Sequence, residues 1–184
     1  MHALVDQIAA SLASRLYYLS LFTSLSVPDI AGALSSENGE ASGQKYAAWY
    51  ETWVRPRFRE NAAARLSPAL RGTVGGLENP LDGDTCYQFR CSLLHQGSTQ
   101  HPKSKVARII FIEPGATTNV FHYGRLNDAL LIDLPGFCSE VLQGAKLWLE
   151  AQENTETVQR NLQRFVQRHP QGLVPYIVGV PVVG

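Results

Sequence analysis

The sequence CYQFRCSLLHQGS occupies residues 86–98 and places a short helix near the middle of the chain. Its apolar residues recur at spacings of three and four, which is the pattern of an amphipathic helix: Cys86, Phe89, Leu93 and Leu94. Asp84 or Thr85 is a suitable N-cap for this helix. Gly97 can adopt the left-handed conformation in which many helices end, so we expect the helix to stop there.

Two longer stretches of helical spacing precede this helix. Between Ala3 and about Leu25 the apolar residues again recur every three or four positions, which predicts one helix. Pro28 suits the first turn of a helix, and we expect a further short helix to begin there. A second long helix is predicted from about Ser42 to Pro56. One side of it is aromatic and is expected to face the core or a dimer partner: Tyr46, Trp49, Tyr50 and Trp53.

The segment between Asn61 and Asp84 is rich in proline and glycine and predicts a long ordered loop. Its GTVGGLENP stretch lacks the Lys-Ser/Thr of a phosphate-binding loop and follows no predicted strand. We therefore interpret it as a connection.

After residue 97 the spacing changes from helical to strand-like. Three short segments are rich in β-forming residues and are bounded by turn residues: 105–113, 118–123 and 129–134. They predict a β-hairpin or a three-stranded meander at about 105–134. Helical spacing then returns around Phe137–Leu149 and Val158–Val166, and the last helix should end before Pro170.

The remaining residues, 171–184, predict an extended tail that packs along the domain or a neighbouring subunit. Its apolar run, Leu173–Val183, has about half of the ~20 residues that a membrane-spanning helix needs, and Pro175 and Pro181 interrupt it. The whole chain is therefore predicted to be one mainly α domain, residues 1–184. We expect a bundle of four or five helices with the β segment inserted between the third and fourth.

The amino-acid composition bears on the compartment of the protein and on the partners that it can bind. The chain of 184 residues has 16 Lys+Arg, 16 Asp+Glu and three cysteines, Cys86, Cys91 and Cys138. An odd number of cysteines and the lack of a leader pattern favour a reduced, cytoplasmic protein without a membrane segment. A net charge of zero argues against bulk electrostatic binding of nucleic acid. The cations nevertheless gather in residues 55–71 and 90–108, so we predict a cationic surface near the motif region and an acidic face on the helix after it. The acids expected in compensation are Asp133, Glu140, Glu150, Glu153 and Glu156.

Arg90 and His95 lie on the same predicted helix with four residues between them. Apolar Leu93 and Leu94 stand between them, and Gly97 follows closely. This arrangement resembles the R-x4-6-H motif of the HEPN superfamily, helical-bundle proteins that include many metal-independent ribonucleases of toxin, phage-defence and CRISPR-associated systems. The residue after the arginine is often Asn or Asp in that family, whereas this chain has Cys91.

The resemblance implies an endoribonuclease that cleaves RNA by attack of its own 2′-hydroxyl, without metal or cofactor. His95 would move protons and Arg90 would hold the scissile phosphate, because imidazole titrates near neutral pH and guanidinium is a permanent, forked cation. Five residues turn the side chains about 140° apart on an ideal helix, so Arg90 must reach around it. The resemblance also implies a homodimer in which two motifs meet, and it allows for an antitoxin partner. Candidate substrate-binding residues follow the helix: Ser98, Thr99, Gln100, Lys103 and Lys105.

Other interpretations of the same residues stay open. In one of them, Arg90 pairs with a carboxylate such as Asp84 and His95 hydrogen-bonds a backbone carbonyl near the helix end, with no further role for either residue. A zinc site could be formed by Cys86, Cys91, His95 and His101, but their spacing does not match that of a structural zinc module. Cys91 could act as a nucleophile with His95, but the sequence shows no oxyanion hole for it. Arg164 and His169 repeat the motif spacing, but Pro170 follows at once and we assign them no role. The alternative function is a non-catalytic helical module that binds a nucleotide or a protein partner.

Overall fold

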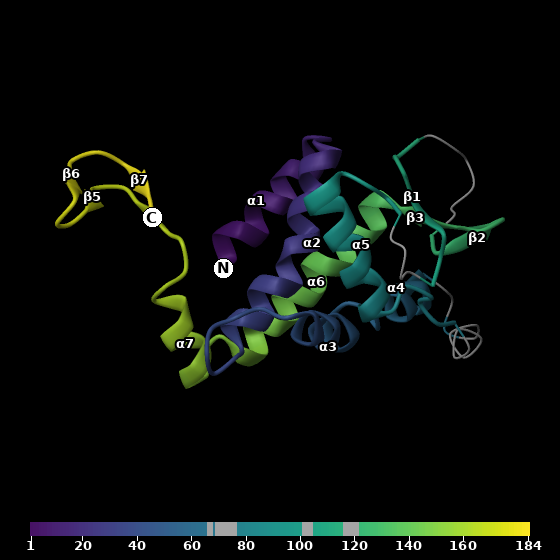
Figure 1. The fold of residues 1–184 in the computed structure, drawn as a ribbon, viewed down its shortest axis with the longest axis horizontal. Helices are drawn as coiled ribbons and strands as arrows, with labels where there is room; N and C mark the ends of the chain where they lie inside the picture. Colours follow the sequence, from purple (N-terminus) through teal and green to yellow (C-terminus); the bar gives the residue numbers. More distant parts are fainter. Residues whose placement is uncertain (66–67, 69–76, 101–104, 116–121) are drawn as a thin grey trace.

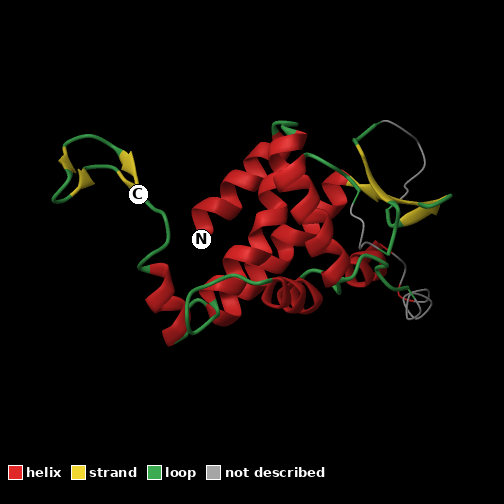
Figure 2. Ribbon diagram, in the orientation of Figure 1, coloured by secondary structure: helices red, strands yellow, loops and turns green. Residues whose placement is uncertain are grey.

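The computed structural model describes residues 1–65, 68, 77–100, 105–115 and 122–184. The protein is mainly α, as predicted (Figure 2). The helices of the body are α1 (His2–Ala13), α2 (Tyr17–Leu34), α3 (Gly43–Trp53), α4 (Arg57–Arg65), α5 (Gly83–Gln96) and α6 (Leu134–Gln152). Helix α7 (Glu156–Leu162) leads away from this body to the C-terminal segment (Figure 1).

The N-terminal helical region differs from the prediction. The predicted helix from residue 3 to about 25 breaks after Ala13, and Arg15 there has a positive φ of 59°. The apolar spacing continues across this break, so the pattern alone does not reveal it. Pro28 lies inside α2 instead of opening a new helix. It lacks only the N–H that would bond to the carbonyl four residues earlier, and the helix continues through it.

Helices α3 and α5 lie close to their predicted ranges. Ser42 caps α3 by accepting a hydrogen bond from the Lys45 backbone N–H. Helix α4 was not predicted, because few of its side chains are apolar and only Phe58 packs against the core. Asp82, two or three residues earlier than predicted, caps α5, and Gly97 ends it with a positive φ of 63°.

A small sheet is formed by the residues between α5 and α6 in the sequence. Its strand order is β1 (Arg108–Ile112), β3 (Ala129–Asp133), β2 (Gly124–Leu126). Strands β2 and β3 form an antiparallel hairpin, whereas β1 runs parallel to β3. The meander is therefore wrong, because a meander would place the second strand in the centre. Most of the strand predicted at 118–123 lies outside the described residues.

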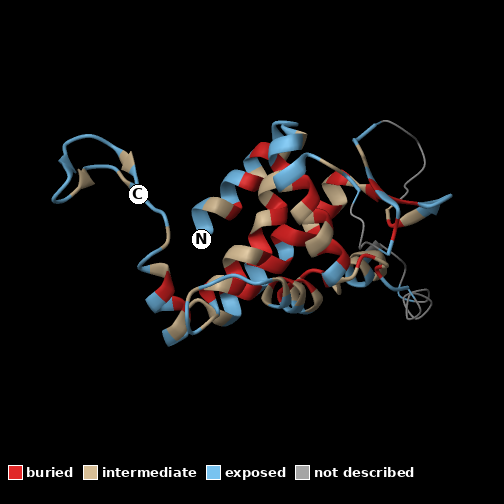
Figure 3. Cartoon of the chain, viewed as in Figure 1, coloured by how far each residue is buried: buried red, intermediate tan, exposed pale blue. Residues whose placement is uncertain are grey.

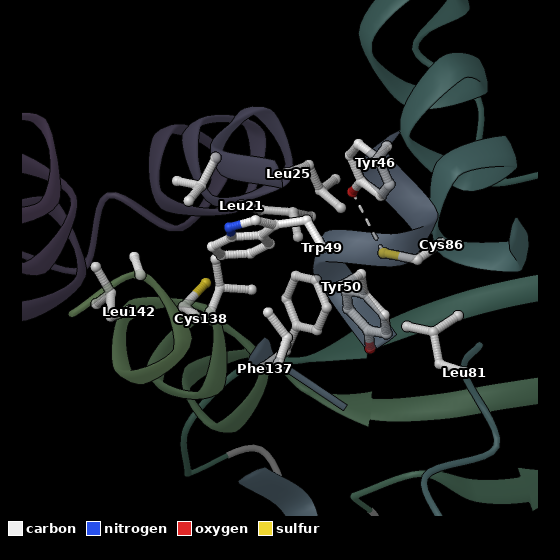
Figure 4. Close-up of a cluster of buried hydrophobic side chains, with 14 of the residues drawn as sticks. Leu21, Leu25, Tyr46, Trp49, Tyr50, Leu81, Cys86, Phe137, Cys138 and Leu142 are labelled. Carbon is white, nitrogen blue, oxygen red and sulfur yellow. Dashed lines mark hydrogen bonds between the residues drawn. The ribbon is translucent and has the colours of Figure 1, made fainter. Parts of the chain in front are cut away.

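Helix α5 approaches α3 closely at Gly83. A Cβ built on Gly83 would lie 2.5 Å from the carbonyl oxygen of Ala47. The core beside this contact contains aromatic residues of α3 and α6 together with Cys86 (Figure 4). Tyr46, Trp49 and Tyr50 are buried, as predicted, and the Tyr46 hydroxyl lies 3.4 Å from Cys86 Sγ.

No described helix has the length and the hydropathy that crossing a membrane requires.

Candidate functional site

The structure brings Arg90 and His95 together at the C-terminal end of α5. Arg90 Nη1 lies 3.1 Å from His95 Nε2, so the arginine side chain does reach around the helix. Arginine can only donate hydrogen bonds, and Nε2 must therefore accept, which leaves the proton of a neutral imidazole on Nδ1. His95 is exposed to solvent. Its accepting nitrogen becomes available as a base when the exposed imidazole turns away from the guanidinium.

Asp29 of α2 holds the other edge of the same guanidinium. Its Oδ2 lies 2.6 Å from Arg90 Nε, and only 20% of the Arg90 side chain and 12% of the Asp29 side chain is exposed. Asp84, the partner suggested by the sequence, is not the one that Arg90 contacts. Burial raises the pKa of Asp29 above its ordinary value, and the charge of Arg90 opposes that rise.

The guanidinium is thus positioned but keeps free donors. Its Nε faces Asp29 and its Nη1 faces His95, with a longer contact of 3.9 Å to Cys91 Sγ. Among the described residues, none accepts a hydrogen bond from Nη2. An oxyanion such as a phosphate oxygen would match the two Nη2 hydrogens.

The polar residues after the helix differ in how close they lie to this pair. Ser98, Thr99 and Gln100 follow directly after the C-cap, and the Ser98 hydroxyl accepts a hydrogen bond from the Gln100 backbone N–H. Lys105 instead pairs with Asp82 at the opposite end of α5, about 20 Å away by the rise of the helix. Lys103 and His101 lie outside the described residues.

The charge pattern also needs correction. Several cations predicted to form an open patch are paired with acids: Arg90 with Asp29, Lys105 with Asp82, Arg55 with Glu51, and Arg57 with Glu60. On α6, Glu140 is only 1% exposed and cannot belong to an acidic surface, whereas Glu150 is exposed. The surface near the motif is therefore less cationic than the residue count suggests.

The cysteines are separated by the fold. Cys86 is fully buried against Tyr46, and burial raises the pKa of its thiol to about 12. It lies nine residues from His95, which places the two side chains on opposite sides of α5. No group of three potential metal ligands occurs within the described ranges. Cys86 and His95 therefore do not share a ligand set.

Arg164 and His169 do not form a second motif. Helix α7 ends at Leu162, and His169 lies in the short strand β4 (Arg168–His169). The equal spacing in sequence therefore has no equivalent on a helix.

A second polar cluster was missed by the sequence analysis, which gave His122 no role. Buried Glu140 of α6 accepts a hydrogen bond from the Tyr123 hydroxyl at 2.6 Å, and its other oxygen lies 3.1 Å from His122 Nε2. The cluster borders a cavity of about 580 Å³ that Phe58 and Asp133 also line. No sequence pattern links residue 122 to residue 140, although a Glu on the apolar face of α6 was a usable signal.

Comparison of the chain with protein-family models, with curated protein sequences and with solved structures gave no match.

Proposed function

We propose that the protein is a metal-independent endoribonuclease whose reaction centre is the Arg90–His95 pair. The observation that carries the proposal is the 3.1 Å contact between Arg90 Nη1 and His95 Nε2 at the exposed end of α5. A guanidinium and an imidazole this close together can act on one phosphodiester, the first as a permanent cation and the second as a proton acceptor.

In the proposed reaction, the Arg90 guanidinium binds a non-bridging oxygen of the scissile phosphate through Nη2. The exposed His95 ring turns away from Nη1, its freed Nε2 accepts the proton of the ribose 2′-hydroxyl, and the 2′-oxygen attacks phosphorus. The bond to the 5′-oxygen breaks, this oxygen takes a proton from water or from a second His95, and a 2′,3′-cyclic phosphate forms. Asp29 acts as a positioning residue, because its ion pair with Nε holds the guanidinium beside α2.

A homodimer fits this chemistry. One protomer offers one imidazole, while cleavage needs a group that takes a proton and a group that gives one. Two copies of α5 meeting at their C-terminal ends would bring two His95 side chains to a single phosphate. The exposure of His95 is compatible with such a meeting.

The test is cleavage of a labelled single-stranded RNA by the purified protein in the presence of EDTA. We expect products that end in 2′,3′-cyclic phosphate. An RNA with deoxyribose at the cleavage position should not be cut at that position, because the attacking 2′-hydroxyl is missing there. His95→Ala should lower kcat by roughly 10² to 10⁴. Arg90→Lys keeps the charge but removes the fork, and we expect it to lower kcat as well.

The matched control is His2→Ala, which removes a histidine outside both the Arg90–His95 pair and the C-terminal segment. It should leave the rate unchanged. Equal activity of the wild type and His95→Ala would show that the cleavage comes from a contaminant, and the proposal would fail.

A second candidate is a non-catalytic module that binds a nucleotide or a protein. The observation in its favour is the pairing of Arg90 with Asp29, which cancels the charge that would attract RNA. Saturable binding without any turnover, unaffected by His95→Ala, would support this function over the first.

A further inference from the structure

The segment Val166–Gly184, here called the arm, projects from the helical body beyond α7 (Figure 1). Two antiparallel pairs of two residues each build it: β4 with β7 (Val182–Val183), and β5 (Gly172–Leu173) with β6 (Ile177–Val178). Within the described part of the chain, its hydrogen bonds stay inside the arm, except one from the Gln167 side chain to the Leu162 carbonyl. Ladders this short are marginal without packing.

The arm is apolar and exposed. Arg168 is its single charged residue. Most of the arm has the colour of exposed residues in Figure 3, with a few intermediate positions. Tyr176 is 84% exposed. Several aliphatic side chains are exposed as well: Val166, Val174, Ile177, Val178, Val180 and Val183. Exposed apolar side chains gathered on one segment are typical of a protein interface.

A matching apolar groove lies elsewhere on the molecule. It is formed where α2 begins, α5 ends and β1 passes, and has a volume of about 580 Å³. Its apolar lining, here called the α2–β1 groove, includes Tyr17, Tyr18, Phe22, Ile110 and Phe111. Tyr18 is 83% exposed, so the described part of the chain leaves a large aromatic surface uncovered at this groove.

The arm does not reach its own groove. Figure 1 places the arm beyond α7 and past α1, whereas β1 lies toward the other end of the longest axis. We propose that the arm of one copy docks in the α2–β1 groove of a second copy. Reciprocal exchange gives a closed dimer, because each chain supplies one arm and one groove.

The area fits a stable dimer. The exposed apolar side chains of one arm present on the order of 700 Å² of surface, so two arms reach the size class of specific interfaces. The groove also includes Gly97, two residues after His95. A docked arm would therefore lie next to the end of α5. The inference rests on the arm and the groove and does not need the chain to be a ribonuclease.

The first test measures the molar mass of the full chain in solution by light scattering at increasing protein concentration. We expect a dimer whose dissociation constant rises roughly tenfold or more when arm residues Val174, Tyr176 and Val178 are changed together to Ser. Tyr18→Ser in the groove should have the same effect. Leu126→Ser, on an equally exposed apolar residue of β2, is the control and should have none.

The second test is disulfide formation between two differently tagged chains, one carrying Tyr176→Cys and the other Tyr18→Cys. We expect a mixed disulfide in high yield, and little when Leu126→Cys replaces Tyr18→Cys. A chain that stays monomeric at every concentration, or a dimer that the arm variant does not weaken, overturns the proposal. A dimer that depends on the arm but gives no Tyr18 disulfide overturns the assignment of the groove.

Discussion

Arg90 Nη1 lies 3.1 Å from His95 Nε2, although the two residues project from α5 in directions about 140° apart. The contact is possible because Asp29, on the neighbouring helix α2, holds Arg90 Nε at 2.6 Å. The guanidinium is thus fixed between a carboxylate and an imidazole.

Asp29→Asn tests this positioning role. Loss of the ion pair leaves the guanidinium free to rotate, and we expect kcat for RNA cleavage to fall about tenfold to a hundredfold with a smaller change in KM. Steady-state kinetics with a defined RNA would measure both. The matched control is Glu37→Gln, which breaks the exposed Glu37–Arg160 pair. An unchanged kcat in folded Asp29→Asn would show that Asp29 does not position Arg90 for catalysis.

The sequence predicted the helix that carries Arg90 and His95, because apolar spacing and a capping glycine are local signals. Asp29 was not predicted, since 61 residues separate it from Arg90 and no periodic pattern connects them. Its contact depends on how α2 packs against α5. Lys105 shows that closeness in sequence does not ensure closeness in space. It follows His95 by ten residues, but it pairs with Asp82 at the opposite end of α5.

The helices and strands likewise show that local sequence patterns predict single elements better than contacts between distant parts of the chain. Helices α3, α5 and α6 have strong apolar stripes and were predicted at nearly their observed ranges. The break between α1 and α2 was missed because Leu12, Leu16 and Leu19 maintain helical spacing across it. Strands β1 and β3 pair in parallel although they are not consecutive in the chain. Strand propensity alone does not determine which strands become neighbours in a sheet.

Glu140→Ala should destabilise the protein strongly. The substitution leaves the buried Tyr123 hydroxyl and His122 without their acceptor, and we expect a loss of about 3 kcal/mol in the free energy of unfolding. Urea denaturation followed by circular dichroism would measure it. Glu150→Ala on the same helix removes an exposed carboxylate and should change the free energy by less than about 0.5 kcal/mol. Similar values for the two variants would contradict the role of the buried cluster.

Gly83→Ala tests the close approach of α5 to α3. The added methyl group would lie 2.5 Å from the Ala47 carbonyl oxygen, so backbone has to move, and we expect a loss of about 1–3 kcal/mol. Thermal and urea unfolding would report it. The control is Gly115→Ala, where the backbone is left-handed but no atom lies within 4 Å of the new Cβ. The strain there should cost about 1 kcal/mol, and a Gly83→Ala variant that is no less stable than the control would be evidence against a tight contact.

The buried thiol of Cys86 should make the stability of the protein depend on pH in the alkaline range. Burial raises the pKa of Cys86 from 9.0 to about 12, so between these values the folded state keeps a proton that the unfolded state loses. Stability therefore falls as pH rises above 9, by about 1.4 kcal/mol per pH unit from this group. Burial raises the pKa of Tyr46 and Tyr50 too, and their contribution has the same sign above pH 10.

Cys86→Ala separates the thiol from the tyrosines. The cavity it leaves lowers the free energy of unfolding at every pH, whereas the thiol's own alkaline penalty disappears. We expect the gap between wild type and Cys86→Ala in urea denaturation to shrink from pH 7 to pH 10.5, and a constant gap would contradict the assignment. Alkylation of the folded protein gives an independent measurement. Half-buried Cys91 should react first, because Cys86 and Cys138 are buried and burial raises the pKa of the Cys138 thiol to about 11.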